Sequence, residues 1–396
     1  MSIIDIINNP VAFVGDLLKS VLGGFLPSWA TTLILMILVV SVILGFLVFT
    51  MLFMTWMERK VVGRIQDRLG PNRVGPLGLL QPIADAIKLL TKEDITPVGA
   101  DRVVYNLAPI VVVIPALMVF AVIPFGRGMI ATDLNIGFLY IVAISSTSTI
   151  AILMAGWGSN NKYSLLGGMR AVAQFVSYEI PMVLAAVGVI LLTGSLSMGV
   201  IVDAQASLPF ILLQPIGFLI FLISGVSEVN RSPFDIPEAE SEIVAGYHIE
   251  YSGLKFAMYF LAEFISAFAI SAIATTLFLG GWQGPLLPPW AWFLIKTYIL
   301  VFVMMWLRGT LPRLRVDQLM GLAWKVLVPL ALVNIMVTGL VNSFTRTQGW
   351  WGIGWSGSLL TALTFLVANF LMAALFVWLY SSRRPAMAGG ASAQRA

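Results

Sequence analysis

The chain has 396 residues, of which 59% are hydrophobic and only 11% charged, with a net charge of +4 and a mean hydropathy of +0.94. Soluble domains carry about 25% charged residues, so this composition excludes a soluble globular protein and indicates a polytopic membrane protein. The chain has no cysteine, which excludes disulfides and thiolate-ligated iron–sulfur clusters, and its single histidine, His248, argues against a histidine-rich metal site or a haem ligand pair.

Residues 1–28 are predicted to form an amphipathic segment lying at one membrane face. The segment contains Asp5 and Asp16 and reaches its first basic residue only at Lys19, so it lacks the charged start of a cleavable signal peptide. Its apolar residues recur at roughly helical spacing, which is typical of an interfacial helix.

Nine segments are apolar enough to cross a bilayer, which requires about 20 residues per helix. We therefore predict an all-α polytopic membrane protein, a bundle of about nine transmembrane helices accompanied by cytoplasmic amphipathic helices. Pro215 and Pro329 fall inside two of the spans and are expected to kink them. The predicted spans are roughly 29–56, 103–125, 136–157, 174–194, 209–228, 256–281, 289–308, 323–344 and 357–380.

The distribution of basic residues predicts the orientation of these spans. If the loop after the first span is cytoplasmic, that side of the membrane receives 19 of the 23 lysines and arginines. Cytoplasmic loops are enriched in basic residues, so the N-terminus is predicted to lie outside and the C-terminus in the cytoplasm.

The loop after the first span combines a basic stretch with a Gly/Pro-rich turn and a short amphipathic helix. Leu79, Ile83, Ile87 and Leu90 share one face of that helix, and Asp85 lies off it. Composition favours a positively charged anchor with an interfacial helix. The alternative is a lid over a membrane-level cavity, with arginines that meet a partner or a lipid headgroup. The basic residues before the turn are Arg59, Lys60, Arg64, Arg68 and Arg73.

A second cytoplasmic loop, 229–255, is acidic, with five carboxylates against two basic residues. The sequence Asp235-Ile236-Pro237-Glu238 has the spacing of a capping box, so a helix is predicted to begin near Asp235 and to carry Asp235, Glu238 and Glu242 on one face. A solvated acidic face is the simplest interpretation of such a run. Apolar residues interleave with these carboxylates, however, which favours a partly buried arrangement.

Three further carboxylates, Glu179, Glu228 and Glu263, lie within or beside predicted spans. An ionisable residue at membrane depth is a candidate functional residue, because a charge there is costly. Together with the acidic loop they predict a chain of carboxylates that serves as a proton path. Lys296 is expected either to balance this charge or to extend to the outer interface. His248 is expected to make a structural hydrogen bond or, alternatively, to donate a proton.

Four long strings show that the chain closely resembles the H-type membrane subunits of respiratory complex I, the proton-pumping NADH:quinone oxidoreductase, whose mitochondrial counterpart is core subunit 1. Together they cover roughly residues 57–332. The strings are ERKVVGRIQDRLGPNRVGPLGLLQPIADAIKLL, SNNKYSLLGGMRAVAQFVSYEIP, EVNRSPFDIPEAESEIVAGYHIEYSG and GTLPRLRVDQLMGLAWKVLVPLAL.

The resemblance implies a membrane subunit that performs no electron transfer itself, forms the quinone entry tunnel and couples quinone reduction to proton pumping. It implies a quinone-tunnel membrane domain at 29–345 containing the eight spans usual for the family, followed by an extra C-terminal transmembrane helix at 346–385. The Gly/Ala-rich composition of residues 386–396 separately predicts a disordered tail. The resemblance assigns Glu58, Arg59, Arg64, Arg68 and Asp85 to the tunnel, and Glu179, Glu228, Asp235, Glu238, Glu240, Glu242 and Glu263 to the carboxylate route.

The same resemblance implies a set of partners in the bacterial cytoplasmic (inner) membrane. Quinone is the substrate, shared with a peripheral subunit that holds the nearest iron–sulfur cluster, while FMN and the other clusters belong to partner subunits. The remaining partners are small membrane subunits, antiporter-like subunits and membrane lipids. No catalytic redox residue, metal ligand or nucleic-acid contact is predicted for this chain.

Two alternatives stay open at the level of sequence. One is the equivalent subunit of a ferredoxin- or hydrogen-driven relative of this complex. The other is an independent proton or cation transporter, which would be expected to carry inverted repeats. No convincing repeat relates the two halves of the chain.

Overall fold

The computed structural model describes residues 9–22, 27–237, 240–349 and 354–382. Within these ranges the chain forms helices and turns, and the only β-structure is one isolated bridge between Gly126 and Met129. The all-α prediction is confirmed. The α-helices are α2 Pro10–Leu22, α3 Ser28–Ile65, α4 Gln81–Thr91, α5 Arg102–Met118, α6 Gly137–Gly158, α7 Lys162–Thr193, α8 Met198–Ala204, α9 Phe210–Leu213, α10 Pro215–Glu228, α11 Glu240–Ile243, α12 Gly253–Phe278, α13 Pro289–Thr310, α14 Val316–Leu322, α15 Val328–Thr347 and α16 Gly354–Ser382.

Four short elements complete the fold. Three are 3₁₀ turns, and the fourth is a π-helical turn that joins α14 to α15. They are η1 Pro76–Gly78, η2 Val119–Ala121, η3 Gly246–His248 and the π-helix η4 Ala323–Leu327.

Eight helical segments of the described chain are long and apolar enough to cross a membrane. They coincide with eight of the nine predicted spans, and this confirms a polytopic membrane protein. Several helices are longer than their apolar stretch: α3 continues to Ile65, and α7 begins at Lys162 instead of near residue 174. Hydropathy detects only the apolar part of a helix. The backbone hydrogen bonds of α3 and α7 continue beyond that part, so these helices are longer than the predicted spans.

The predicted span that has no such segment, 209–228, is broken into two short helices. Gln214 separates α9 from α10 with non-helical backbone angles of φ −134° and ψ 62°. Pro215 has no backbone N–H and occupies the first turn of α10, where that donor is not needed. The expected effect of Pro215 is therefore confirmed, and α10 is a half-helix of 14 residues.

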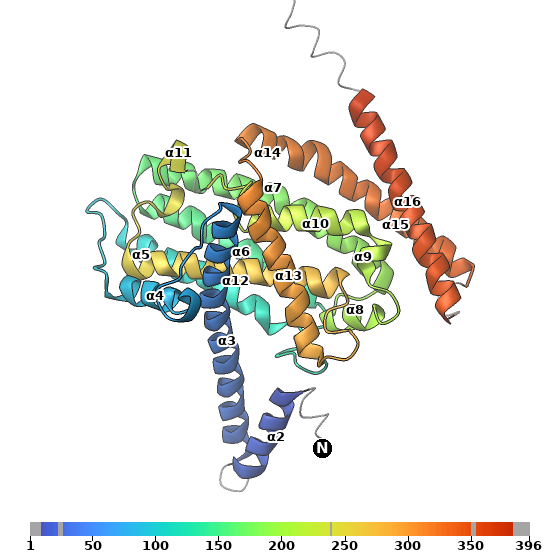
Figure 1. Ribbon diagram of the computed structural model, residues 1–396, viewed down its shortest axis with the longest axis horizontal. Coiled ribbons are helices and arrows are strands. Elements are labelled where there is room, and N and C mark those ends of the chain that lie inside the picture. The colour runs from blue at the N-terminus through green and yellow to red at the C-terminus, as the bar shows by residue number, and fades with distance from the viewer. Residues whose placement is uncertain (1–8, 23–26, 238–239, 350–353, 383–396) are drawn as a thin grey trace, which may run out of the picture.

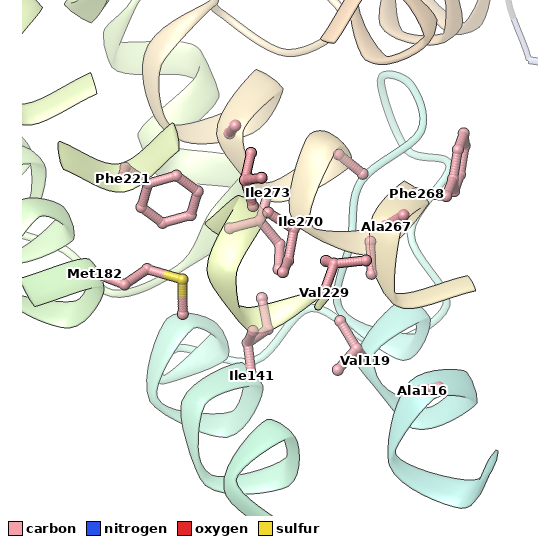
Figure 2. Packing of buried hydrophobic residues seen from close by; sticks show 14 of the residues in the cluster. Ala116, Val119, Ile141, Met182, Phe221, Val229, Ala267, Phe268, Ile270 and Ile273 are labelled. Atoms are coloured by element: carbon pink, nitrogen blue, oxygen red, sulfur yellow. The ribbon is translucent and has the colours of Figure 1, made fainter. Parts of the chain in front are cut away.

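Figure 1 shows how the helices are arranged. Helices α5, α6, α7, α10 and α12 form the body of the bundle. The C-terminal half of α3 crosses this body steeply, and its N-terminal half extends out of the bundle beside α2. Helix α16 lies at the opposite edge, against α15. In the centre, Met182, Phe221, Val229 and Ile270 converge from different elements (Figure 2) and line an internal cavity described below.

The two short helices predicted to lie at the membrane surface are both present. Helix α2 falls within the predicted segment 1–28, and α4 exposes Ile83, Ile87 and Leu90 on one face, as expected for an interfacial helix. Helix α16 falls within the predicted extra helix 346–385. The boundaries of the four predicted regions stay predictions, and the tail 386–396 lies outside the described residues.

Candidate functional site

Four charged side chains from separate parts of the chain meet in a network that is largely buried, with Arg308 its most exposed member at 36%. Arg231, in the turn after α10, donates to Glu58 on α3 at 2.7 Å and to Glu263 on α12 at 3.1 Å. Arg308 on α13 forms a second ion pair with Glu58. We call Glu58, Arg231, Glu263 and Arg308 the charged network. It joins α3, α12 and α13 to the loop that follows α10.

The charged network balances its own charge, with two carboxylates against two guanidinium groups. The Arg231 side chain is only 6% exposed, and its guanidinium also lies over the Phe264 ring at 4.4 Å. A buried charge is tolerated only when opposite charges and hydrogen bonds compensate its lost hydration. Arg231 supplies that compensation to two carboxylates at once, so neither can change partner without affecting the other.

The network borders a large polar cavity, which we call the basic cavity. The cavity has a volume of about 820 Å³ and lies at the C-terminal end of α3 and the loop that follows. Glu58 and Arg308 of the network line it together with Arg59 and Arg68. Its remaining lining residues are Val62, Gln66, Leu69, Gly70 and Pro71.

Helix α4 is held beside the basic cavity by Asp85. The Asp85 carboxylate accepts from Arg59 at 2.5 Å and from Lys88 at 3.3 Å. Partial burial raises the pKa of Asp85, but hydrogen bonds and charge from Arg59 and Lys88 outweigh burial and hold that pKa below its usual value. Asp85 is therefore an ionised anchor that ties the amphipathic helix to α3.

On its other side the charged network reaches a smaller space, the internal cavity, of about 90 Å³. Glu263 and Glu228 both line it, together with Tyr247 and Tyr259 and many apolar side chains. One carboxylate oxygen of Glu228, Oε2, is buried without a hydrogen-bond partner among the described residues. The internal cavity thus brings two predicted carboxylates to one mainly apolar space inside the bundle.

Two further predicted carboxylates approach the same region. Glu179 on α7 accepts a hydrogen bond from Ser146 on α6 and interacts electrostatically with Glu228. Asp235 interacts electrostatically with Glu263. Glu58 is thus linked to Glu263 through Arg231, Glu263 and Glu228 line the same cavity, and Glu179 lies near enough to Glu228 for their like charges to repel.

The acidic loop differs from its predicted form. Residues 235–237 are not helical, and the helix of this loop is the four-residue α11, which begins at Glu240. The predicted helix start near Asp235 is wrong, because the chain there turns inward and buries Phe234 and Ile236. Without a continuous helix, Asp235 and Glu242 do not share a face.

The remaining predicted residues are less closely placed. Glu242 is 44% exposed and pairs with Arg170 at 2.7 Å and Arg313 at 3.6 Å. Arg64 is exposed and is not among the residues that line the basic cavity. Glu238 and the side chain of Glu240 lie outside the described residues.

Sequence reasoning missed Arg231 and Arg308 as site residues. Both entered only the count of basic residues, although the position of Arg231 three residues after Glu228, between two apolar runs, was a usable signal. Arg308 gave no such signal, because it lies where positive charge is expected at the end of a span. Its ion pair with Glu58 spans 250 positions of the sequence.

Lys296 and His248 lie outside the network. Lys296 donates to the backbone oxygens of Leu279, Gly281 and Gln283 at 2.7 to 3.1 Å, beyond the end of α12 remote from Glu263. This agrees with its expected extension toward the outer interface. His248 packs against Tyr247, and its Nδ1 has no hydrogen-bond partner among the described residues, so the expected structural hydrogen bond is not made at that atom.

Among the described residues no group of three or more histidine, cysteine or carboxylate side chains is arranged to hold a metal ion. The fold and site define a polytopic membrane protein in which a charge-balanced network separates a basic cavity from an internal, carboxylate-lined cavity. Residues 37–339 match the family model described as NADH dehydrogenase, and the chain belongs to this family.

Curated relatives agree with this assignment. The chain is 58% identical over 297 residues to the H subunit of NADH-quinone oxidoreductase from Dehalococcoides mccartyi strain CBDB1, which covers 75% of this chain and 84% of the relative. It is 51% identical over 326 residues to the protein of the same name from Brevibacillus brevis, covering 80% and 96% of the two chains. It is 50% identical over 321 residues to the H subunit numbered 2 from Syntrophobacter fumaroxidans, covering 79% and 97%.

We predict that Arg231→Met destabilises the protein strongly, because Glu58 and Glu263 then lose the cation they share. Breaking a buried ion pair from one side costs about 3–5 kcal/mol. Adding Glu263→Gln to Arg231→Met should recover part of this loss, since one uncompensated charge is removed. Thermal melting of both single variants and the double variant, analysed as a double-mutant cycle, measures this coupling.

The matched control for Arg231 is Arg170→Met, which removes the partly exposed pair with Glu242. This variant should cost about 1 kcal/mol or less. Equal destabilisation by the two arginine substitutions, or no recovery in the double variant, would contradict the shared role of Arg231.

A second prediction concerns pH. Burial lowers the pKa of His248 from its ordinary 6.5 to about 4. The unfolded chain then binds a proton more readily than the folded one, so stability that is present above pH 6.5 is lost as the pH falls from 6.5 toward 4. His248→Gln should lose less stability over this interval. Melting curves of both proteins at matched pH values test this, and a difference that does not change with pH would contradict it.

Proposed function

We propose that the chain is the H-type membrane subunit of an NADH–quinone oxidoreductase, a respiratory complex I. In this role it forms part of the quinone entry tunnel and couples quinone reduction to proton translocation without transferring electrons itself. One observation carries the proposal: Glu58 lines the basic cavity and, through Arg231, is bonded to Glu263, which lines the internal cavity with Glu228.

The basic cavity suits a quinone headgroup. Its volume of about 820 Å³ falls in the range of small-molecule sites. Arg59 and Arg68 offer charge-assisted hydrogen bonds to the carbonyl oxygens of a quinone, and the exposed apolar face of α4 supports contact with an isoprenoid tail or lipid. Electrons must come from a partner subunit, since this chain has no cysteine for a thiolate-ligated cluster.

The charged network supplies a physical means of coupling. Quinone reduction adds two electrons, and the two protons that form the quinol are taken from groups at the site. Until those protons are replaced, the basic cavity beside Glu58 and Arg308 carries additional negative charge. A movement of Arg231 toward Glu58 weakens its pair with Glu263, and a proton at Glu263 would then replace the missing positive charge. Glu228 and Glu179 continue the carboxylate series beyond the internal cavity, toward the antiporter-like subunits.

The proposed location is the bacterial cytoplasmic membrane, with the N-terminus outside. The asymmetry of basic residues supports this orientation. Because the chain has no native cysteine, the substitutions Lys162→Cys and Arg127→Cys report one side each. A membrane-impermeant thiol reagent should label Lys162→Cys only from the cytoplasmic side and Arg127→Cys only from the opposite side. The reverse pattern would contradict the orientation.

Arg68→Ala tests the quinone half of the proposal. We expect a KM for a short soluble quinone roughly tenfold higher, because a charge-assisted hydrogen bond of about 1.5 kcal/mol or more is lost. Arg73→Ala is the matched control, since Arg73 is an exposed arginine of the same loop that does not line the cavity. Equal KM values for the two variants would argue against quinone binding at this position.

Glu263→Gln tests the coupling half. In the assembled complex we expect proton translocation and coupled turnover to collapse, while NADH oxidation by the peripheral subunits with an artificial acceptor persists. Asp203→Asn, an exposed acid outside the network, is the control and should behave as wild type. Unchanged proton translocation in Glu263→Gln would leave Glu263 as a tolerated buried acid.

The two alternatives predict different behaviour. An equivalent subunit of a ferredoxin- or hydrogen-driven complex would assemble with a different peripheral arm and would show no quinone-dependent phenotype for Arg68→Ala. An independent transporter would move protons or cations when reconstituted alone. The match of residues 37–339 to one family model favours the complex I subunit over both.

A further inference from the structure

The break between α9 and α10 lies against a second buried polar cluster, which the proposed function does not use. Its members are Gln214 at the break, Asn334 and Thr338 on α15, and Asn369 on α16. Their exposed fractions are 0%, 0%, 1% and 2%, so all four are enclosed by protein. Polar side chains this deeply buried in a membrane protein require partners.

Part of this requirement is met directly. Asn369 Nδ2 donates to the backbone oxygen of Leu213 at 3.0 Å, and Gln214 Nε2 donates to Thr338 Oγ1 at 3.0 Å. The Leu213 oxygen is one that the helix break leaves outside the regular i→i−4 pattern, because Gln214 is not helical. Helix α16 therefore satisfies a backbone group that the break releases.

The rest of the requirement is not met by the described residues. Gln214 Oε1, Asn369 Oδ1 and both polar atoms of Asn334 have no hydrogen-bond partner among the described residues. Leaving a buried polar group unpaired is destabilising, because the group loses its hydration without gaining a protein partner. Four such atoms around one backbone break indicate a site that binds a small polar ligand.

Two glycines let the polar side chains of the cluster approach the helix backbones closely. A Cβ atom added at Gly217 would lie 3.1 Å from Gln214 Oε1 and 3.2 Å from Asn334 Nδ2, so both atoms lie beside that residue. A Cβ at Gly188 on α7 would lie only 2.8 Å from the Gln214 amide. Any larger residue at either position would displace the Gln214 side chain from the break.

The chemistry of the free atoms favours water. They comprise three acceptor oxygens and one N–H donor, and water both donates and accepts, typically with two to four partners. A cation would use the oxygens but not the nitrogen, and the four side chains of the cluster include no carboxylate to balance its charge. We propose that Gln214, Asn334 and Asn369 bind ordered water at the α9–α10 break, and that α16 closes this site.

The water site takes no part in the proposed quinone chemistry, and one of its helices, α16, lies beyond the family match. That match ends at residue 339, whereas α16 begins at Gly354, so Asn369 comes from a part of the chain that the family model does not cover. The other three residues lie within the match.

The first test uses the wild-type complex. Cryo-electron microscopy at a resolution that reveals ordered solvent should show density within hydrogen-bond distance of Asn334 and Gln214, unchanged when sodium and potassium are replaced by choline. Density that disappears with the alkali cations would overturn the assignment to water. A direct hydrogen bond between Gln214 and Asn334 with no density beside it would overturn the site.

The second test uses the near-isosteric variants Asn334→Leu and Asn369→Leu, with Thr364→Val as the control. Thr364 lies on α16 and bonds only to oxygens of its own helix, so its replacement should not matter. Replacing a hydrated Asn334 removes its hydrogen bonds to water, so the melting temperature of Asn334→Leu should fall. Asn369→Leu also removes the direct bond to the Leu213 oxygen, so it tests only the closure of the break by α16. An unhydrated asparagine is a cost that leucine removes, so a higher melting temperature in Asn334→Leu would contradict the proposal. If a variant does not assemble, the density of the wild-type complex decides.

Discussion

The arrangement of this protein depends on Arg231, a single guanidinium shared by two buried carboxylates. Arg231 bonds to Glu58 on α3 and Glu263 on α12, and these helices bring together segments more than 200 positions apart. Buried Gln174 supports the loop that carries Arg231, since its Nε2 donates to the backbone oxygens of Ser227 at 2.7 Å and Phe234 at 2.8 Å. The turn after α10 is therefore fixed from both sides by polar contacts inside the bundle.

This dependence explains how a chain with few charged residues can place several of them within its core. Charge in a low-dielectric interior is stable only in balanced sets, and a balanced set responds as a unit when one member changes. The charged network occupies the wall between the basic cavity and the internal cavity. In the proposed function, a change of charge in the basic cavity acts through Arg231 on Glu263, which lines the internal cavity.

The same physical rule operates at the far edge of the bundle. The break at Gln214 releases backbone groups at a depth where lipid cannot satisfy them, and α15 and α16 supply amide and hydroxyl side chains in response. Helix α16 thus belongs to the packed structure, although it follows the part of the chain that matches the family. Both polar clusters lie where a loop or a break interrupts the regular helices.

The sequence by itself determined the fold class, nearly all the spans, two short amphipathic helices and an irregularity at Pro215. Lipid exposure and the missing proline N–H act locally, so both can be predicted from the residues of the segment itself. The sequence also predicted Glu179, Glu228 and Glu263 as candidate site residues, because a carboxylate at membrane depth is costly, whereas Glu58 was predicted only from the resemblance to the family. Only the tertiary structure decided which charges pair, that Arg231 and Arg308 complete the network, and that Asp235 lies in a turn. Those outcomes depend on contacts between helices distant in sequence, and neither periodicity nor hydropathy records which helix becomes the neighbour of which.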